Sequence, residues 1–532
     1  MVRLVIMWKY VPIVLFSHVL YANEASELSK ASNNPHQGYA SKNTLVVDDE
    51  CLNITGFYFQ GNTLFTEDEF KIPEGLPDKC ISVDNVNQLA RYITSIYLIN
   101  GYVAARVNFL PQNSQGELGV NINEGVIERI EGSDRRVNHK FLFPNVEGQP
   151  LKISDIDQAI DQANRLRSNK VKLDVLPGSV EGMSIIRINN TDAKPWSLIA
   201  SVNNYGYKNT DEWKANTSFF WDSPLGWSDL FNINISRTLE NPKKRYKQEY
   251  SLLYSVPYGK FTFSAATSDM QYRRYEKPTT RIIKFDGGVQ QYSFETNFMF
   301  YRNNQQINTL SSILKHKKGN SFVNDTKVNV NSYQFTSLEL GINHFHIIPN
   351  GSMNFNFSVE KGLSWLDFPK DNSKNKNYQN RDFTKSKMMI NLNKRFYLLD
   401  SPYQINSSLV GEYSRKEIMP SERLSLTNRD AVRGFSRGAL SGDSGWYIKN
   451  TLSRYFGLRD VMLIPRAGAD VGRILSHGSK QGWQSNVGLS AGITLHYNHM
   501  QFDLEASRGF WLSESAKIKE PVQFLLKSSF TF

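Results

Sequence analysis

The stretch SMNFNFSVE, residues 352–360, alternates polar and apolar side chains along its whole length. Its apolar residues are Met353, Phe355, Phe357 and Val359, and serine or asparagine stands between them. Because successive side chains of a β-strand point to opposite faces, this spacing predicts a strand with one apolar and one polar face. Soluble sandwiches also alternate in this way, so the stretch alone does not decide between a protein core and lipid.

The same alternation continues through the C-terminal part of the chain, residues 195–532. It recurs in SLLYSVPYG (251–259), in QFDLEA (501–506) and in the last strand, which ends at Phe532. A single soluble core of this length would be unusual, because cores tend to split above ~250–300 residues. In lipid, only a closed barrel satisfies the backbone groups of every strand. The region therefore predicts a mainly β fold with a transmembrane antiparallel β-barrel over 195–532.

The N-terminal 22 residues have the pattern of a secretory signal peptide. Arg3 and Lys9 precede or border an apolar core, and Ala22 precedes a polar run. The apolar core is short for a membrane-spanning helix, which needs ~20 apolar residues. We therefore expect 1–22 to be removed on export and the polar segment 23–50 to form a leader or linker.

Cysteine usage and charge agree with an exported protein. The two cysteines are Cys51 and Cys80, and an isolated pair this close in an exported chain predicts a disulfide. The net charge is +11, but the basic residues are scattered through the C-terminal half without a compact basic motif. This distribution favours solvated loops or contact with anionic lipid headgroups, and we expect no nucleic-acid partner.

Between the leader and the predicted barrel, the apolar residues take helical spacing. Residues 82–101 place apolar side chains on one helical face, with Ser82 as the predicted N-cap. Two strands follow, so 51–134 is predicted to be a compact α+β module. A second helix, with Ser154 as its predicted N-cap, and two more strands form a similar module over 135–194. The similar order of the two modules predicts a diverged tandem repeat.

The tetrapeptide Gly442-Asp443-Ser444-Gly445 is the one that surrounds the nucleophile of trypsin-like serine proteases. A catalytic serine needs a base that is itself oriented by a third group, and none of the nine histidines stands in the setting those proteases use. A turn rich in glycine, serine and aspartate explains the tetrapeptide. His344 and His346 could face the same way, but two ligands make a poor metal site. We therefore expect no enzyme: no catalytic residue, no metal and no cofactor.

The motif Val432-Arg433-Gly434-Phe435 resembles the signature of outer-membrane barrels that carry POTRA domains. In that superfamily the signature lies on a long sixth extracellular loop that folds back into the lumen. Its arginine meets the aspartate of a short Asp-x-Gly motif, which Asp470 and Gly472 match here. An aromatic residue that usually stands two positions before the aspartate is replaced by Gly468. The resemblance implies a directional arginine–carboxylate pair, and the Gly442–Gly445 segment then belongs to the start of the next strand.

Further motifs, in the right order along the chain, resemble the two-partner secretion transporters, the hemolysin activator/secretion family of that superfamily. They are Glu124-Gly125, Pro177-Gly178 and Asp222-Ser223-Pro224. The resemblance implies two periplasmic POTRA domains, 51–134 and 135–194, and an outer-membrane barrel of about 16 strands in a Gram-negative cell. Phe530 and Phe532 resemble the aromatic terminus read by the barrel-assembly machinery. Many members also begin with a plug helix, for which 23–50 is the candidate.

The resemblance also implies a function. Such a transporter recognises a large partner exoprotein through its POTRA domains and exports it unfolded through the barrel pore, without ATP. The expected partners are a hemolysin, adhesin, contact-inhibition toxin or haem-binding protein, outer-membrane lipid, and the barrel-assembly machinery during biogenesis. Two alternatives stay open, a barrel-assembly factor of the same superfamily and a passive porin. A porin would need no periplasmic modules.

Overall fold

The computed structural model describes 51–70, 81–132, 134–191, 193–206, 212–240, 245–276, 282–363, 382–436, 440–513 and 520–532. The predicted signal peptide, 1–22, and the predicted leader or plug helix, 23–50, lie outside the described residues. The chain divides into two units, one made of Lys194–Pro224 and Asp229–Phe532 and the other ending at Ala193 and including Leu225–Ser228. Each unit is described by itself.

The N-terminal unit contains two three-stranded sheets with the same topology. The first module consists of β1 (Gly56–Gln60), η1 (Glu67–Glu69), α2 (Val83–Ile99), β2 (Arg106–Leu110) and β3 (Glu117–Asn123). The second consists of β4 (Val126–Glu131), α3 (His139–Leu142), α4 (Ile153–Asn164), β5 (Val171–Pro177) and β6 (Met183–Asn190). In both sheets the last strand lies in the middle, parallel to the first strand and antiparallel to the second. The two modules therefore form the predicted tandem repeat.

The boundary between the modules differs from the predicted one. We expected the first module to extend to residue 134, but β4 pairs with β6 of the second sheet. Gly125 separates β3 from β4 and has a φ of +72°, a conformation that other residues rarely adopt. The boundary between the modules therefore lies at Gly125. The sequence did not reveal it, because the apolar alternation continues across this glycine while the strands on its two sides belong to different sheets.

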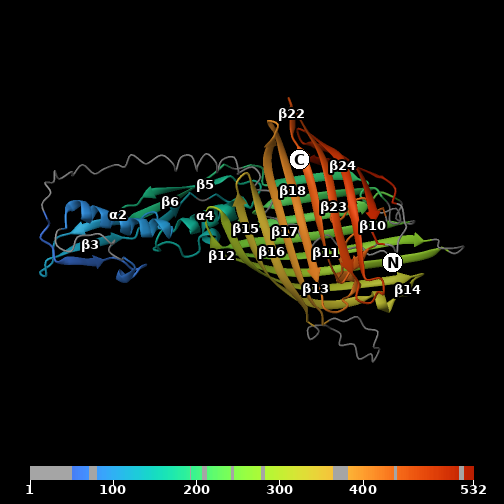
Figure 1. Cartoon of the computed structure of the whole chain (residues 1–532), viewed down its shortest axis with the longest axis horizontal. Coiled ribbons are helices and arrows are strands. Elements are labelled where there is room, and N and C mark those ends of the chain that lie inside the picture. The colour runs from blue at the N-terminus through green and yellow to red at the C-terminus, as the bar shows by residue number, and fades with distance from the viewer. Residues whose placement is uncertain are drawn as a thin grey trace. The chain divides into compact units, whose positions relative to one another are not determined.

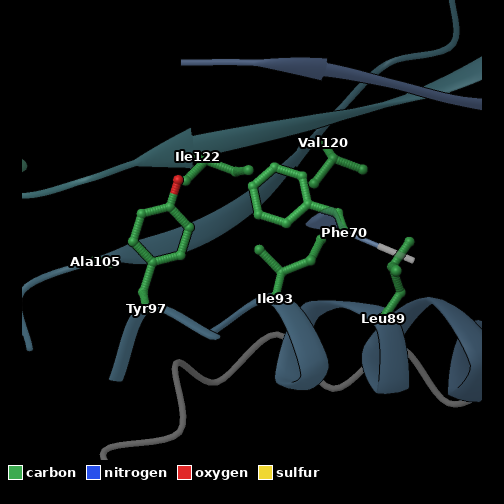
Figure 2. Close-up of a cluster of buried hydrophobic side chains, with 7 residues drawn as sticks. All are labelled: Phe70, Leu89, Ile93, Tyr97, Ala105, Val120 and Ile122. Carbon is green, nitrogen blue, oxygen red and sulfur yellow. The ribbon is translucent and has the colours of Figure 1, made fainter. Parts of the chain in front are cut away.

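The core of the first module lies between α2 and its sheet. Figure 2 shows Leu89, Ile93 and Tyr97 projecting from the helix toward the sheet, with Phe70 among them. Ser82 caps α2 as predicted, accepting a hydrogen bond from the amide of Asn85 at 3.3 Å. The predicted apolar face of this helix is therefore the face that packs on the sheet.

A buried carboxylate ties the end of β3 to this core. Glu124 accepts hydrogen bonds from the amides of Thr63 and Leu64, both at 2.8 Å, and from the Tyr97 hydroxyl at 2.9 Å. Burial of the ring, and then its hydrogen bond to Glu124, raise the pKa of Tyr97. The two residues of the Glu124-Gly125 pair thus have different structural roles. Glu124 binds the end of β3 to the core of the first module, and Gly125 forms the turn that leads into β4 of the second.

The C-terminal unit is a closed antiparallel barrel (Figure 1), in which 16 long strands of the described chain take part. They are β7 (Trp196–Asn203), β8 (Lys214–Asp222), β9 (Leu230–Thr238), β10 (Tyr246–Tyr258), β11 (Phe261–Glu276), β12 (Ile283–Arg302), β13 (Gln306–Val323), β15 (Tyr333–Ile348), β16 (Gly351–Gly362), β17 (Thr384–Leu398), β18 (Ser401–Tyr413), β21 (Ser444–Arg454), β23 (Val461–Leu475), β24 (Trp483–Tyr497), β25 (Met500–Trp511) and β26 (Gln523–Thr531). The short elements are β14 (Thr326–Lys327), η2 (Asn329–Asn331), η4 (Pro420–Glu422), β19 (Leu424–Ser425), β20 (Ser441–Gly442) and β22 (Phe456–Leu458). β26 pairs with β7 and closes the barrel.

Burial along the strands is inverted relative to a soluble protein. In β16, Phe357 is 41% exposed, whereas the neighbouring Ser358 is 2% exposed. In β25, Phe502 and Leu504 are exposed and Asp503 between them is buried. Apolar side chains on the outside and polar ones inside are typical of a barrel that spans a membrane. The apolar face predicted from residues 352–360 is therefore the outer face of the barrel wall.

The strand connections distinguish the two ends of the barrel. One end carries short turns, such as Gly259-Lys260 and Pro349-Asn350, whereas the other carries the long connections, including 414–443. Outer-membrane barrels have short periplasmic turns and longer extracellular loops, which identifies 414–443 as an extracellular connection. Among the described residues, no helix is long and apolar enough to cross a membrane.

Candidate functional site: the loop inside the barrel

We call the connection between β18 and β21, residues 414–443, the lumen loop. Its residues 431–435 are all buried, and Val432 is completely inaccessible to solvent. The loop contacts separate parts of the barrel wall: Glu422 forms an ion pair with Lys317 of β13, and Arg433 forms one with Asp470 of β23. Because both partners are lumen-facing, the loop extends into the interior of the barrel.

Arg433 and Asp470 form a bidentate pair. The guanidinium atoms Nε and Nη2 each lie 2.7 Å from one carboxylate oxygen of Asp470, and the backbone amide of Arg433 donates to the same carboxylate at 3.1 Å. Both side chains are almost fully buried. A paired, hydrogen-bonded geometry is what a buried charge requires, since an unpaired one would be costly.

The other donors of the guanidinium bind β21. Nη2 also donates to the carbonyl of Asn450 at 2.7 Å, and Nη1 donates to the hydroxyl of Thr451 at 3.2 Å. Thr451 lies opposite Gly468 in the pairing of β21 with β23. Arg433 therefore joins the lumen loop to two adjacent strands of the barrel wall, beyond the single carboxylate that the sequence indicated.

Glycines on the wall make room for the loop. A Cβ on Gly468 would lie 2.1 Å from Arg433 Nη2, and one on Gly488 would lie 2.4 Å from the Arg433 carbonyl oxygen. On Gly472, the predicted site glycine, a Cβ would meet Leu426 of the loop at 2.4 Å. Gly468, which departs from the family pattern, is thus the residue that lets the guanidinium reach β21.

Gly434 and Phe435 continue the contact onto β25. Gly434 has a φ of +89°, and its carbonyl accepts a hydrogen bond from the Gly509 amide at 2.8 Å. The Phe435 ring lies over Gly509, whose Cβ would come within 2.5 Å of it, and packs edge-on against Trp511 at a centroid distance of 5.1 Å. All four residues of the motif are therefore buried against the wall.

The Gly442–Gly445 segment serves the structure of the loop exit. Ser444 and Gly445 begin β21, whereas Gly442, which we expected in the same strand, ends the separate short strand β20. The Ser444 hydroxyl donates to the carbonyl of Ser414 at 3.0 Å and accepts from its amide, so it joins the two ends of the loop. Asp443 accepts from the amides of Ile418 and His477 at 3.0 and 2.8 Å. The ring of His477 lies 2.8 Å from the Ser414 carbonyl oxygen, so its nitrogen is directed at backbone and not at the serine.

The remaining predicted residues lie in the N-terminal module and the last strand. Cys51 is disulfide-bonded, and Cys80 lies outside the described residues. Their neighbours Leu52 and Ile81 form a β-bridge, with the Leu52 amide 2.8 Å from the Ile81 carbonyl oxygen. The rings of Phe530 and Phe532 lie in contact, tilted by 58° with centroids 4.4 Å apart.

Sequence reasoning missed the contacts around Ser436 and Glu422 of the loop. Ser436 donates through its amide and its hydroxyl to Glu520, at 3.1 and 2.9 Å. Glu422 enters a buried group of lysines and glutamates on β13 to β18. A lone glutamate or serine in a loop carries no pattern, so only the lysines and glutamates at alternate strand positions could have indicated these contacts.

Comparisons with known proteins agree with this geometry. The family "Haemolysin secretion/activation protein ShlB/FhaC/HecB" matches residues 182–495, a ShlB-type POTRA domain matches 52–125 and a further POTRA domain matches 126–177. The two domain matches meet at the boundary that the sheets show.

Curated relatives and solved structures were also found. Hemolysin transporter protein ShlB of Serratia marcescens is 46% identical over 91% of this chain and 86% of its own length. Hemolysin transporter protein HpmB of Proteus mirabilis is 42% identical over 92% of this chain and 88% of its own. The structure of CdiB from Escherichia coli shares the fold, with a TM-score of 0.83, 21% identity and coverage of 97% of this chain and 98% of that one. The family match spans more than half of the chain, and the chain therefore belongs to the ShlB/FhaC/HecB family of outer-membrane two-partner secretion transporters.

Proposed function

We propose that this protein exports a large hemolysin-type exoprotein from the periplasm, through its barrel, to the cell surface or medium. The observation that carries the proposal is one chain that joins two POTRA modules to a closed barrel containing the arginine-anchored lumen loop. The outer membrane is the location of this family's barrels, with the POTRA domains in the periplasm. A passive porin would have no use for the two modules.

The relatives support a hemolysin-type client for the proposed export. The proteins that share 46% and 42% identity are named hemolysin transporters, whereas a CdiB transporter of Dickeya dadantii shares 25% and a heme/hemopexin transporter HuxB of Haemophilus influenzae shares 22%. The higher identity covers the POTRA modules as well as the barrel, because the matches span about nine-tenths of this chain. A hemolysin-like client is therefore favoured over a contact-inhibition toxin, an adhesin or a haem-binding protein.

The POTRA modules would hold the client as an extended segment. In both sheets the strand that follows the helix, β2 or β5, lies at an edge. An edge strand can add a further strand through main-chain hydrogen bonds, while neighbouring side chains supply selectivity. β2 and β5 with the adjoining helices α2 and α4 are the proposed docking edges.

Export would proceed without ATP and without catalysis by this chain. The family and the relatives found for it are transporters, and no enzyme family was found among them. Directional folding of the client outside the cell would supply the free energy. The barrel-assembly machinery would recognise Phe530 and Phe532 during biogenesis. The aromatic side chains exposed on the barrel wall would contact lipid. Cys51 and Cys80 would form a disulfide in the first module.

The proposal is tested by expressing this gene, with the exoprotein gene beside it, in a Gram-negative host that lacks both. We expect a large protein in the medium and lysis of added erythrocytes only when both genes are present. A transporter deleted for residues 51–190 is the control for the POTRA modules: it keeps the barrel sequence, and we expect it not to export the client.

Two results would count against the proposal. Export without lysis would remove the hemolysin assignment and keep the transporter. An unchanged medium together with a loss of many outer-membrane barrels in a strain deleted for this gene would favour a barrel-assembly factor.

A further inference from the structure

We propose that Glu422 is a second positioning residue of the lumen loop, which holds the loop to the wall of β13 to β18 independently of Arg433. The Arg433 site lies on β21, β23, β24 and β25, and Glu422 lies eleven positions earlier in the loop, next to other strands. The two attachments would fix the loop at two separate places on the barrel wall.

Glu422 contacts two lysines of the wall. Its carboxylate oxygen Oε1 lies 2.6 Å from Lys317 Nζ, and Oε2 lies 3.7 Å from Lys385 Nζ. Lys385 also donates to the backbone carbonyl of Glu422 at 2.8 Å. Glu422 is 2% exposed and Lys385 is fully buried, so these contacts form away from bulk water.

These three residues belong to a connected group of buried charges, the lysine–glutamate cluster. Lys385 lies 3.4 Å from Glu412, and Lys387 lies 2.8 Å from Glu339 and contacts Glu360. The members among the described residues are Lys315, Lys317, Lys385, Lys387, Glu339, Glu360, Glu412 and Glu422. Every member except Glu422 projects from a barrel strand.

Among the described residues, the loop supplies one of the four carboxylates of this cluster, that of Glu422. Within the described chain, four lysines face four glutamates, and one of those glutamates is Glu422. Neutralising Glu422 while the loop stays packed on the wall would remove one negative charge from a site of low solvent access. An excess charge in such a site is unfavourable, because the attraction that offset its desolvation is lost. The wall therefore attracts the carboxylate of the loop.

Strand register explains why the charges meet. Glu360 of β16 lies opposite Glu339 of β15 and Lys385 of β17. Lys387 of β17 lies opposite Glu412 of β18. Side chains directly opposite one another on the same face are close enough to interact, so the wall presents a continuous group of charges of both signs to the loop.

Apolar contacts accompany the charge. Ile418 and Met419, just before η4, are buried in a cluster with Phe335 of β15 and Phe383 next to β17. Pro420 is the first residue of η4 and Glu422 is its last, so the carboxylate follows the apolar cluster by three positions. The segment 418–422 therefore combines an apolar anchor, which fixes its position, with a carboxylate that recognises the cluster.

This inference rests on the proposed function only in the premise that the loop must move during export, and it is tested without a client. Purified full-length protein in planar lipid bilayers is compared as wild type, Glu422→Gln and Glu417→Gln. Glu417 is a matched control, because it lies in the same loop, is 60% exposed and pairs with Arg423. Each variant is first shown to be folded, by the resistance of its barrel to unfolding in detergent gels.

Loss of one buried ion pair should raise the frequency of channel openings about tenfold or more in Glu422→Gln, with little change in Glu417→Gln. Glu422→Asp, which keeps the charge, should recover part of the closed state. Combining Glu422→Gln with Arg433→Ala should open the channel more than either change alone. If Glu422→Gln does not fold, Lys317→Gln tests the same pair from the wall. If folded Glu422→Gln, or folded Lys317→Gln in its place, opened as rarely as the wild type, the inference about Glu422 would be overturned. That result would leave the proposed export function untouched.

Discussion

Hydrogen bonds to the barrel wall hold the buried guanidinium of Arg433 in place. Five hydrogen bonds connect its side chain and amide to Asp470, Asn450 and Thr451. Breaking a buried pair by removing one partner typically costs about 3–5 kcal/mol, because the other charge remains buried. The loop position is therefore sensitive to changes that move the guanidinium by a fraction of an ångström.

At this scale we predict that Gly468→Ala impairs export while the barrel still assembles. The new Cβ would lie 2.1 Å from Arg433 Nη2, so the guanidinium must shift and lose hydrogen bonds to β21. Losing one to two such bonds costs about 1.5–3 kcal/mol, which corresponds to a fall in export of about tenfold or more. Immunoblots of client in the medium and of barrel in the outer membrane measure both quantities.

Gly457→Ala is the matched control for this change. Gly457 also lies in a barrel strand, β22, and nothing stands within 4 Å of its would-be Cβ. Its export should equal that of the wild type. Equal export by Gly468→Ala and Gly457→Ala would show that the guanidinium tolerates the displacement.

The sequence predicted part of this site. Arg433 pairs with Asp470 as the resemblance implied, and Gly472 lies where the loop approaches the wall. Gly468 was interpreted as a departure from the pattern, whereas it accommodates the guanidinium. Spacing along one strand identifies the aspartate, but the need for space at Gly468 depends on where a loop 35 positions earlier in the chain folds back.

Helix α2 and strand β3 are joined by a buried hydrogen bond between Tyr97 and Glu124. The bond is 2.9 Å long, and burial together with this bond raises the pKa of Tyr97 above its ordinary value of 10.0. A raised folded-state pKa means that the folded module holds the phenolic proton more tightly than the unfolded one. This contribution to stability is complete below about pH 10 and decreases as the pH rises above it.

We predict that Tyr97→Phe destabilises the first module by about 1–2 kcal/mol near neutral pH, because Glu124 loses a donor. The difference from wild type should shrink above pH 10, where wild-type Tyr97 also loses stability. Pulse proteolysis of the full-length protein with an alkali-tolerant protease, at pH 8 to 11, measures cleavage within 83–123. Tyr102→Phe, which leaves the bond to Glu124 in place, is the control. A difference between Tyr97→Phe and wild type that grew with pH would contradict the predicted direction.

The sequence predicted the helices and strands themselves more accurately than the residues at which they begin and end. Ser82 caps α2 as predicted, but Ser154 does not cap α4, whose N-cap is Lys152, two residues before the predicted one. The module boundary was placed at residue 134, nine positions after Gly125, because β3 and β4 form one continuous apolar pattern. Periodicity reports which face is apolar, and it does not report with which sheet a strand pairs.

At the scale of the whole molecule, the barrel reverses the burial pattern of a soluble protein: apolar side chains are exposed on its outer face and polar side chains are buried inside. Phe357 is exposed on the outer face of the barrel and Asn356 lies on the opposite face, although they are adjacent in β16. The alternation in 352–360 did not by itself distinguish a lipid-facing strand from a soluble one; its persistence through residues 195–532, a length unusual for one soluble core, led to the barrel prediction. The lysine–glutamate cluster was not predicted, since its members come from strands that meet only through register.

We predict that Phe357→Arg lowers the amount of assembled barrel, whereas Asn356→Arg does not. An arginine near the middle of the lipid-facing surface costs about 2–4 kcal/mol, and one in the lumen remains hydrated. Heat-modifiable migration of the barrel in outer-membrane fractions measures assembly. Similar losses in both variants would mean that the two faces of β16 are not distinguished by lipid.

The most direct test of the central claim compares export and barrel abundance in Arg433→Ala and Arg433→Lys. The lysine keeps the charge but cannot form the bidentate pair with Asp470. Arg415→Ala, an exposed arginine of the same loop, is the control. We predict normal barrel abundance in all three, normal export for Arg415→Ala, and a loss of the large protein from the medium of at least about tenfold for both Arg433 variants. Normal export by the Arg433 variants at normal barrel abundance would contradict the account.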